Sequence, residues 1–215
     1  MTLRASMLRS ALPCAAAALA LAACAEPTRS APGGDYVAHL ESPYSVEGAA
    51  VIELTSRELE AAFTTHRVLV GRATSDSTVA FLLLNPPADR RGLPLAMTVR
   101  MAPGAVPPRA RVVTVASVSN LVRDFPASYR VRYTRPEDTP ADRRGALVGA
   151  AAHHAPVPFA RIAEALLGGD PLAPEEEARV DAIGNRNGLL DPGDARAYLL
   201  AHPEETPAFP VWSGR

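Results

Sequence analysis

The residues whose types and spacing best suit chemistry lie in Gly184–Asp194, which reads GNRNGLLDPGD. A twelve-residue calcium-binding loop carries oxygen ligands at positions 1, 3, 5, 7, 9 and 12, and a glycine at position 6 allows a sharp turn. With Gly188 at position 6, the later ligand positions hold Asn185, Asn187, Leu189 (through its backbone carbonyl), Asp191 and Asp194. Because Ca²⁺ prefers oxygen ligands, this spacing predicts a calcium site.

The first ligand position departs from this pattern, because Ile183 has no side-chain oxygen. Asp181 is the nearest preceding acid, and it can serve as the first ligand if Ala182 and Ile183 form a local insertion. With few carboxylates and two neutral amides, the expected calcium affinity is weak, roughly 10⁻⁴–10⁻³ M. The predicted metal ligands are Asp181, Asn185, Asn187, Leu189, Asp191 and Asp194, and the predicted cofactor is Ca²⁺.

A metal-free turn is the alternative interpretation of the same residues. Asp191 is a good helix N-cap, followed by a proline at the first helical position and by an acid, Asp194, at the third. The glycines and asparagines of the stretch also suit a turn that needs positive φ angles. The sequence therefore leaves two alternatives open, a calcium loop and a capped helix–turn–helix.

The stretch DAIGNRNGLLDPGDARAYL, residues 181–199, resembles a dockerin-type, EF-hand-like calcium segment, whose loop ends in Asp and continues into a helix. It differs from dockerins at Ile183 and in having one convincing copy where dockerins normally have two. The resemblance implies a small helix–loop–helix module whose partner is a protein with a β-sandwich, cohesin-like surface, or a second copy of this chain.

Residues 35–135 show the pattern of antiparallel strands. Apolar and polar residues alternate in 95–101 and 129–133, which is typical of half-buried strands. Residues 78–84 and 111–118 are apolar on both faces, as in interior strands, and further strands are expected in 36–42, 48–55 and 66–71. Proline- and glycine-containing turns separate these segments. The predicted fold of this region is an antiparallel β-sandwich of about seven to nine strands.

The stretch YVAHLESPYSVEGAAVIEL, residues 36–54, resembles the opening of a cohesin-like domain, a fold related to some carbohydrate-binding modules. This resemblance implies an alternative function, a carbohydrate-binding surface lipoprotein whose β-sandwich binds a polysaccharide. Exposed aromatic residues commonly bind sugars, but Tyr129 and Tyr133 share an apolar strand face and are expected in the core. Trp212 is expected to be a packing anchor.

Helical patterns follow the strands. Apolar positions in 159–167 form one stripe, 174–183 opens with a proline and three glutamates, and 192–202 follows the calcium-like loop. The chain therefore divides into the β-sandwich (35–135), a linker (136–158), the dockerin-like helical module (159–202) and a proline-rich tail (203–215).

The N-terminus predicts export. Arg4 and Arg9 precede an apolar run, residues 14–23, that is too short to span a bilayer and is typical of a signal peptide. Leu21–Cys24 resembles the lipobox of bacterial lipoproteins, which implies a signal peptide over 1–23, lipidation of Cys24 and a tether over 25–34. Cleavage by an ordinary signal peptidase beside Cys24 is the alternative. We expect an exported, membrane-anchored lipoprotein, at the outer membrane or cell surface rather than at the cytoplasmic membrane.

Charge and motifs argue against other classes. Residues 35–135 hold 12 Arg and 9 acids, a net +3, which is too small an excess for a nucleic-acid partner. Residues 159–215 hold 5 Arg and 10 acids, a net −5, which suits a cation-binding segment. No catalytic motif for a hydrolase, a metalloprotease or a phosphate loop occurs, so we expect no catalytic residues and no enzyme. The sequence predicts a non-enzymatic surface lipoprotein acting in protein–protein interaction or assembly.

Overall fold

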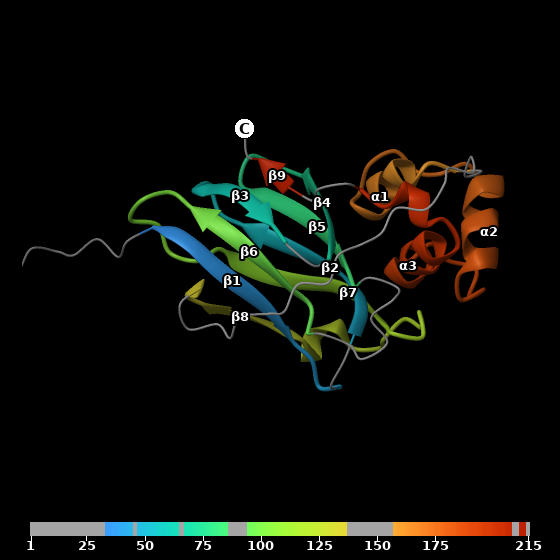
Figure 1. The fold of residues 1–215 in the computed structure, drawn as a ribbon, viewed down its shortest axis with the longest axis horizontal. Helices are drawn as coiled ribbons and strands as arrows, with labels where there is room; N and C mark the ends of the chain where they lie inside the picture. Colours follow the sequence, from blue (N-terminus) through green and yellow to red (C-terminus); the bar gives the residue numbers. More distant parts are fainter. Residues whose placement is uncertain are drawn as a thin grey trace, which may run out of the picture.

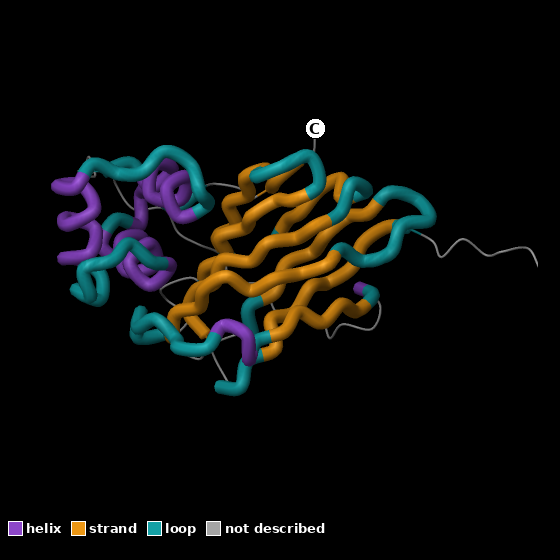
Figure 2. The backbone as a smooth tube through the Cα atoms, turned by 180° about the vertical axis from the view of Figure 1, so that it is seen from behind, coloured by secondary structure: helices purple, strands orange, loops and turns teal. Residues whose placement is uncertain are grey.

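The computed structural model describes residues 33–44, 47–64, 67–85, 94–136, 157–207 and 211–213. The predicted signal peptide, Cys24, the tether up to residue 32 and linker residues 137–156 lie outside these ranges. The described part is mostly antiparallel β-sheet with three α-helices (Figure 1; Figure 2). This confirms the prediction of a β-rich chain followed by a small helical segment.

The strands form two antiparallel sheets. The five-stranded sheet contains, in spatial order, β8 (Arg130–Thr134), β1 (Gly34–Glu41), β6 (Ala96–Met101), β3 (Leu59–Phe63) and β9 (Val211–Ser213). The four-stranded sheet contains β4 (Val68–Ala73), β5 (Thr78–Leu84), β2 (Glu47–Thr55) and β7 (Arg109–Ser117). One 3₁₀ turn, η1 (Pro126–Ser128), precedes β8, and another, η3 (Pro203–Glu205), precedes β9.

Alternate side chains from both sheets meet in one apolar core. In β6, Met97, Val99 and Met101 are buried whereas Arg100 is exposed, as the alternation in this segment predicted. The core also receives alternate residues of β2, β5 and β1, namely Ala50, Ile52, Leu54, Val79, Phe81, Leu83, Tyr36, Ala38 and Leu40. Burial of one face of every paired strand stabilises the register, because a one-residue slip would expose that face.

The helices α1 (Phe159–Leu166), α2 (Pro174–Ile183) and α3 (Pro192–Ala201) form a helical module at one end of the sheets (Figure 1). They cover the face of the four-stranded sheet that points away from the five-stranded sheet. Val51, Leu82 and Leu84 on this face form a second apolar cluster with helical residues that include Phe159, Ile162 and Tyr198. This packing explains why residues 78–84 are apolar on both faces: one face contacts the other sheet, and the other contacts helices.

Two strands were not predicted from the sequence. β3 has only five residues, of which one is a glutamate and two are alanines, and β9 lies in the segment predicted to be an irregular tail. Trp212 of β9 lies opposite Ala62 of β3, and its indole packs edge-on against Phe81 with ring centroids 5.7 Å apart. The expectation that Trp212 anchors the tail by packing is confirmed. Among the described helices, none is long and apolar enough to cross a membrane.

Candidate calcium loop

The predicted metal ligands lie in and around the turn that joins α2 to α3. Ile183 is the last residue of α2, and Pro192 is the first of α3. The turn contains positive φ angles at Arg186 (58°) and Gly188 (80°). Gly188 therefore provides the conformational freedom that the sequence assigned to it, whereas the other positive φ angle falls on an arginine.

Asp191 is the last residue of the turn, directly before α3, and is 7% exposed. Its Oδ1 accepts hydrogen bonds from the backbone N–H groups of Gly193 (2.6 Å) and Asp194 (3.3 Å), which is an N-cap of α3. Its Oδ2 accepts from the side-chain amides of Asn185 (2.7 Å) and Asn187 (2.9 Å). One carboxylate thus both caps the helix and gathers the two asparagines predicted as ligands.

Asp194 is fully buried and directed toward backbone groups. Its two oxygens accept from the N–H groups of Asn185 (3.0 Å) and Asp191 (2.9 Å), which completes a capping box with Asp191. The pKa of Asp194 is raised to about 6, mainly by burial and to a smaller extent by the nearby charges of Asp191 and Asp181, while the two backbone donors partly oppose this rise. Asp194, the predicted ligand at loop position 12, therefore accepts hydrogen bonds from backbone N–H groups in this structure.

Asp181 reaches the loop from the last turn of α2. Its Oδ1 accepts from the N–H of Asn187 (2.9 Å) and its Oδ2 from the N–H of Gly188 (3.2 Å). Ala182 and Ile183 complete the helix between Asp181 and the turn. Asp181 thus contacts the loop through two backbone N–H groups, and Ala182 and Ile183 form regular helix where a local insertion was expected.

The two leucines of the loop face different surroundings. Leu189 is 66% exposed, and its N–H donates to Asn187 Oδ1 (2.8 Å). Leu190 packs against the apolar cluster beneath the helices, and its N–H donates to Glu177 Oε1 (3.3 Å). The loop is therefore anchored at Leu190, and it exposes an apolar side chain at Leu189.

These side chains can offer a cation a set of oxygen donors. Asp181, Asp191, Asn185 and Asn187 are linked to one another by short hydrogen bonds through the loop. Asp181, Asp191 and Asp194 form no salt bridge among the described ion pairs. Carboxylate and amide oxygens are the type of ligand that a hard cation such as Ca²⁺ prefers. In this structure each of these side-chain oxygens accepts a hydrogen bond from within the loop, which is the arrangement of the metal-free capped turn. No group of three His, Cys, Asp or Glu side chains arranged to hold a metal occurs in the described ranges.

Sequence reasoning missed two residues that hold this loop to the sheet. Asn120 follows β7 with a positive φ angle (64°), and its carbonyl oxygen accepts from Asn185 Nδ2 (2.9 Å). Arg196 of α3 is 3% exposed and donates from Nη1 to Asn120 Oδ1 (2.7 Å). The same side chain donates to the carbonyl oxygens of Val118 (2.9 Å) and Asn85 (3.3 Å). These contacts join residues 65 to 111 positions apart, so no local pattern could reveal them.

Gly193 allows this close approach. A Cβ added at Gly193 would lie 2.1 Å from the carbonyl oxygen of Asn120, so a larger residue would displace the α3 N-terminus from the turn that follows β7. The glycine in the Asp-Pro-Gly-Asp segment is thus explained by tertiary packing. Its presence is the one signal in the sequence that could have pointed to a neighbouring backbone.

Comparison of the chain with protein-family models, curated proteins and solved structures gave no match.

Proposed function

We propose that this protein is a non-enzymatic, exported surface lipoprotein that acts in protein–protein interaction or assembly and binds Ca²⁺ at the loop 181–191. The observation that supports this proposal most is that Asp181, Asp191 and Asp194 lie around one turn. None of these three carboxylates takes part in a salt bridge among the described ion pairs. Asp181 and Asp191 act unfavourably on the charge of Asp194. A divalent cation held by the side-chain oxygens of Asp181, Asn185, Asn187 and Asp191 would balance that charge.

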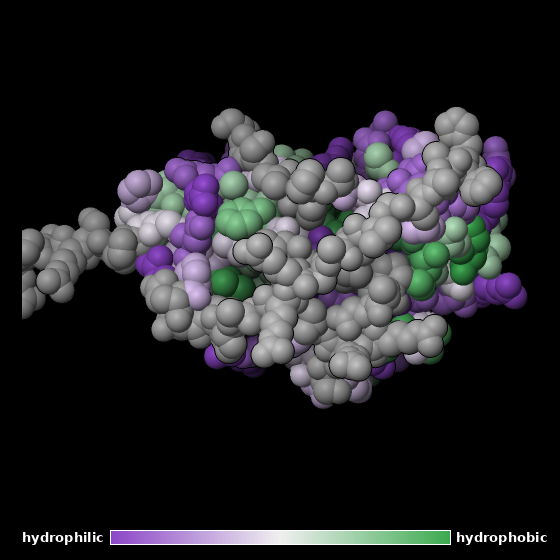
Figure 3. Space-filling view, in the orientation of Figure 1, coloured by the Kyte–Doolittle hydropathy of each residue, from purple (hydrophilic) through white to green (hydrophobic). Residues whose placement is uncertain are grey.

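The surface around the loop supports a role in protein–protein interaction. The turn after β7 and the calcium loop touch through Asn120 and Asn185. The first carries three exposed apolar side chains, Leu121, Val122 and Phe125, and the second carries Leu189. Figure 3 shows apolar surface at the helical end of the molecule. Exposed apolar groups with a polar rim are typical of interaction sites.

Calcium would act on this surface through Asn185. The Nδ2 group of Asn185 donates both to Asp191 Oδ2 and to the Asn120 carbonyl. If Asn185 turns its Oδ1 toward a cation, its contact with the turn after β7 changes. The metal would thereby select one arrangement of the two loops, since the amide can offer an oxygen or a nitrogen to a given neighbour but not both.

The remaining parts of the proposal rest on the sequence. We interpret the two sheets as a β-sandwich with one outer face covered by the helices, and the partner as a β-sandwich protein or a second copy of this chain. Cys24 carries the lipid anchor in this proposal. Mass spectrometry of the protein purified from membranes tests the anchor. A diacylglycerol-modified Cys24 at the N-terminus is expected, whereas an unmodified N-terminus after residue 24 or 25 would contradict it.

Calorimetric titration of the full chain with calcium tests the metal site. The full chain is needed because the helices bury their apolar face on the sheet. We expect a dissociation constant of roughly 10⁻⁴–10⁻³ M, and weaker binding by at least about tenfold in Asp181→Asn, which keeps the side-chain shape. Asp170→Asn is the matched control, because Asp170 is an exposed acid outside the loop in the same helical module. Absence of binding at millimolar calcium, or unchanged binding in Asp181→Asn, would refute the metal site.

Sedimentation velocity with calcium or with a chelator tests self-association, and cross-linking in membranes followed by mass spectrometry tests a separate partner. In either assay, complex formation should depend on calcium and should decrease in Leu189→Ser and Phe125→Ser. Val106→Ser is the control, because Val106 is also exposed but lies between β6 and β7. A complex that forms equally in all variants would show that these loops are not the interaction surface.

A further inference from the structure

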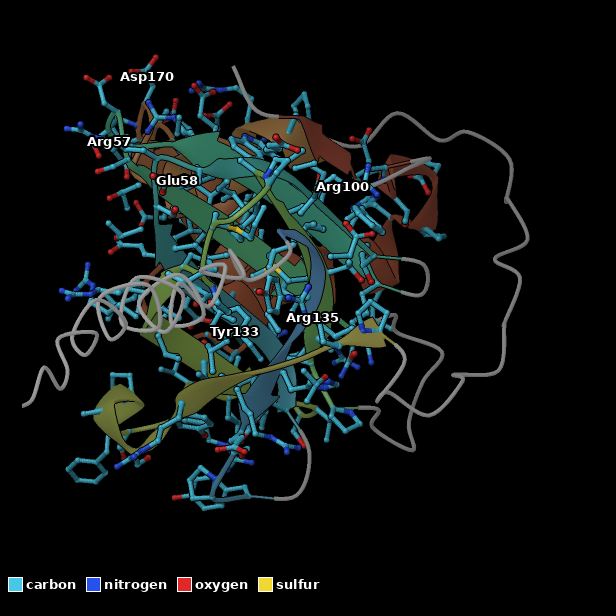
Figure 4. The ribbon with its side chains drawn as sticks, turned by 90° about the vertical axis from the view of Figure 1, so that its left-hand side faces the viewer. Arg57, Glu58, Arg100, Tyr133, Arg135 and Asp170 are labelled. Atoms are coloured by element: carbon cyan, nitrogen blue, oxygen red, sulfur yellow. The ribbon has the colours of Figure 1, made fainter. Side chains whose placement is uncertain are left out.

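A separate cavity lies at the end of the sheets remote from the helices. It has a volume of about 350 Å³ and is formed by the turn between β2 and β3, the turn between β4 and β5, and Trp212. Figure 4 shows Arg57 and Glu58, from the first of these turns, together at one edge of the molecule. This volume is at the lower end of the range of small-molecule sites, about 300–1,000 Å³.

The polar wall of the cavity is held in place by short local hydrogen bonds. Ser56 Oγ donates to Glu58 Oε2 (2.8 Å) and accepts from the Glu58 N–H (3.1 Å), so the carboxylate is fixed beside its own turn. On the opposite turn, Ser75 Oγ accepts from the N–H groups of Ser77 (3.3 Å) and Thr78 (3.1 Å). The two turns are tied together by the Ser56 N–H, which donates to the Ser77 carbonyl (2.7 Å).

The apolar wall includes a fixed aromatic ring. Trp212 is half-buried, and its indole lies edge-on to Phe81. A Cβ added at Gly71 would lie 2.8 Å from the indole Cδ1, so the ring rests directly on the backbone of β4. Because neighbours on two strands hold the ring, it can serve as a rigid surface for a ligand at little cost in conformational entropy.

We propose that this cavity binds a short, neutral saccharide. Arg57 donates N–H groups, whereas Glu58 and Asp76 accept, so neighbouring sugar hydroxyls can pair with both kinds of group. The C–H face of a sugar ring can pack on the indole. The lining holds three acids, Glu58, Glu60 and Asp76, against the single Arg57, which disfavours an anionic ligand. Serine and threonine side chains make up much of the remaining lining and suit a hydroxyl-rich ligand rather than an apolar one.

The emission of Trp212, the only tryptophan of the chain, allows a direct test. The full chain is titrated with maltose, cellobiose, lactose and N,N′-diacetylchitobiose, and a broader glycan array with the same protein covers other neutral saccharides. At least one saccharide should change the tryptophan emission in a saturable way. Arg57→Ala and Glu58→Gln should each weaken its binding about tenfold, as expected for the loss of one charge-assisted hydrogen bond.

Three comparisons make the test decisive. Asp170→Asn should bind the saccharide like the unchanged protein, and so should Asp181→Asn, since the calcium loop lies at the other end of the sheets. Trp212→Phe, measured by calorimetry, should fold and bind more weakly. The proposal is overturned if no saccharide binds, if Arg57→Ala and Glu58→Gln bind as well as the unchanged protein, or if spermidine changes the emission and neutral sugars do not.

Discussion

Replacement of Arg196 tests whether the loop between α2 and α3 is held by the sheet. The Arg196 guanidinium is buried between α3 and two turns of the sheet region, where it donates to Val118 O, Asn120 Oδ1 and Asn85 O at 2.9, 2.7 and 3.3 Å. Its aliphatic stem also packs closely, because a Cβ added at Gly48 would lie 3.1 Å from Arg196 Cδ. Arg196→Met keeps most of this stem and removes the donors, and Arg196→Ala removes both.

The expected loss follows from these contacts. A hydrogen bond to a charged group contributes about 1.5–3 kcal/mol, but removal of a buried charge also removes its desolvation cost. Water can reach part of the space left behind and satisfy some of the acceptors. We therefore expect the free energy of unfolding to fall by about 2–3 kcal/mol in Arg196→Met and by about 3–4 kcal/mol in Arg196→Ala, where stem packing is lost as well. These losses are large against a typical total stability of about 5–15 kcal/mol.

Urea unfolding followed by circular dichroism and by Trp212 emission measures the change. Arg179→Met is the control, because Arg179 lies exposed on α2, and we expect a change within about 0.5 kcal/mol. Arg196→Met should also weaken calcium binding, since Asn120 positions Asn185. If Arg196→Met matches the Arg179→Met control in stability, Arg196 does not hold the helices to the sheet.

Three other perturbations have distinct expected results. In Gly71→Ala the added methyl would lie 2.7 Å from Phe81 Cε1 and against Trp212, so thermal unfolding should show a loss of about 1–3 kcal/mol; an unchanged midpoint would contradict this packing. The pKa of Asp194 is raised from 3.8 to about 6, so its contribution to stability should be complete below about pH 4 and should be lost, by up to about 3 kcal/mol, as the pH rises through 6. Urea midpoints should show this slope and Asp194→Asn should lack it. Residues 157–207 alone should show little helical circular dichroism, because their apolar cluster is completed by the sheet; a stable isolated module would refute this.

Much of the sheet could be predicted because its pattern is local. Alternation in residues 95–101 and 129–133 indicated one apolar face in each segment, and the structure buries Met97 and Val99 of β6 and Tyr129, which directly precedes β8. β3 was missed because a five-residue strand with Glu60 and small residues has too weak an alternation to stand out. β9 was missed because three residues in a proline-rich segment become a strand only when β3 offers them an edge.

The two segments that are apolar on both faces show where a local pattern is no longer sufficient: β5 is an interior strand as expected, whereas β7 lies at the edge of its sheet. Residues 78–84 indicated a strand buried on both faces, but not that helices from the far end of the chain cover the second face. Similarly, the spacing of Asn185, Asn187 and Asp191 indicated that these side chains would share one turn, and they do. Their orientation could not be predicted, because it depends on Asn120, which is distant in the sequence, and on the burial of Asp194.

β2 runs from one proposed site to the other, and its rigid packing indicates that the two sites act independently. Gly48, at one end of β2, lies against Arg196, and Ser56, just beyond the other end, lines the cavity. A nine-residue strand spans roughly 30 Å. β2 is paired on both edges and buried on both faces, so it is a rigid spacer rather than a flexible link. Changes at separate sites with no shared partners add. The combined variant Asp181→Asn/Arg57→Ala should therefore lose calcium and saccharide binding by the factors seen in the single variants. If either ligand binds more weakly to the combined variant than to the corresponding single variant, the loop and the cavity are coupled through β2.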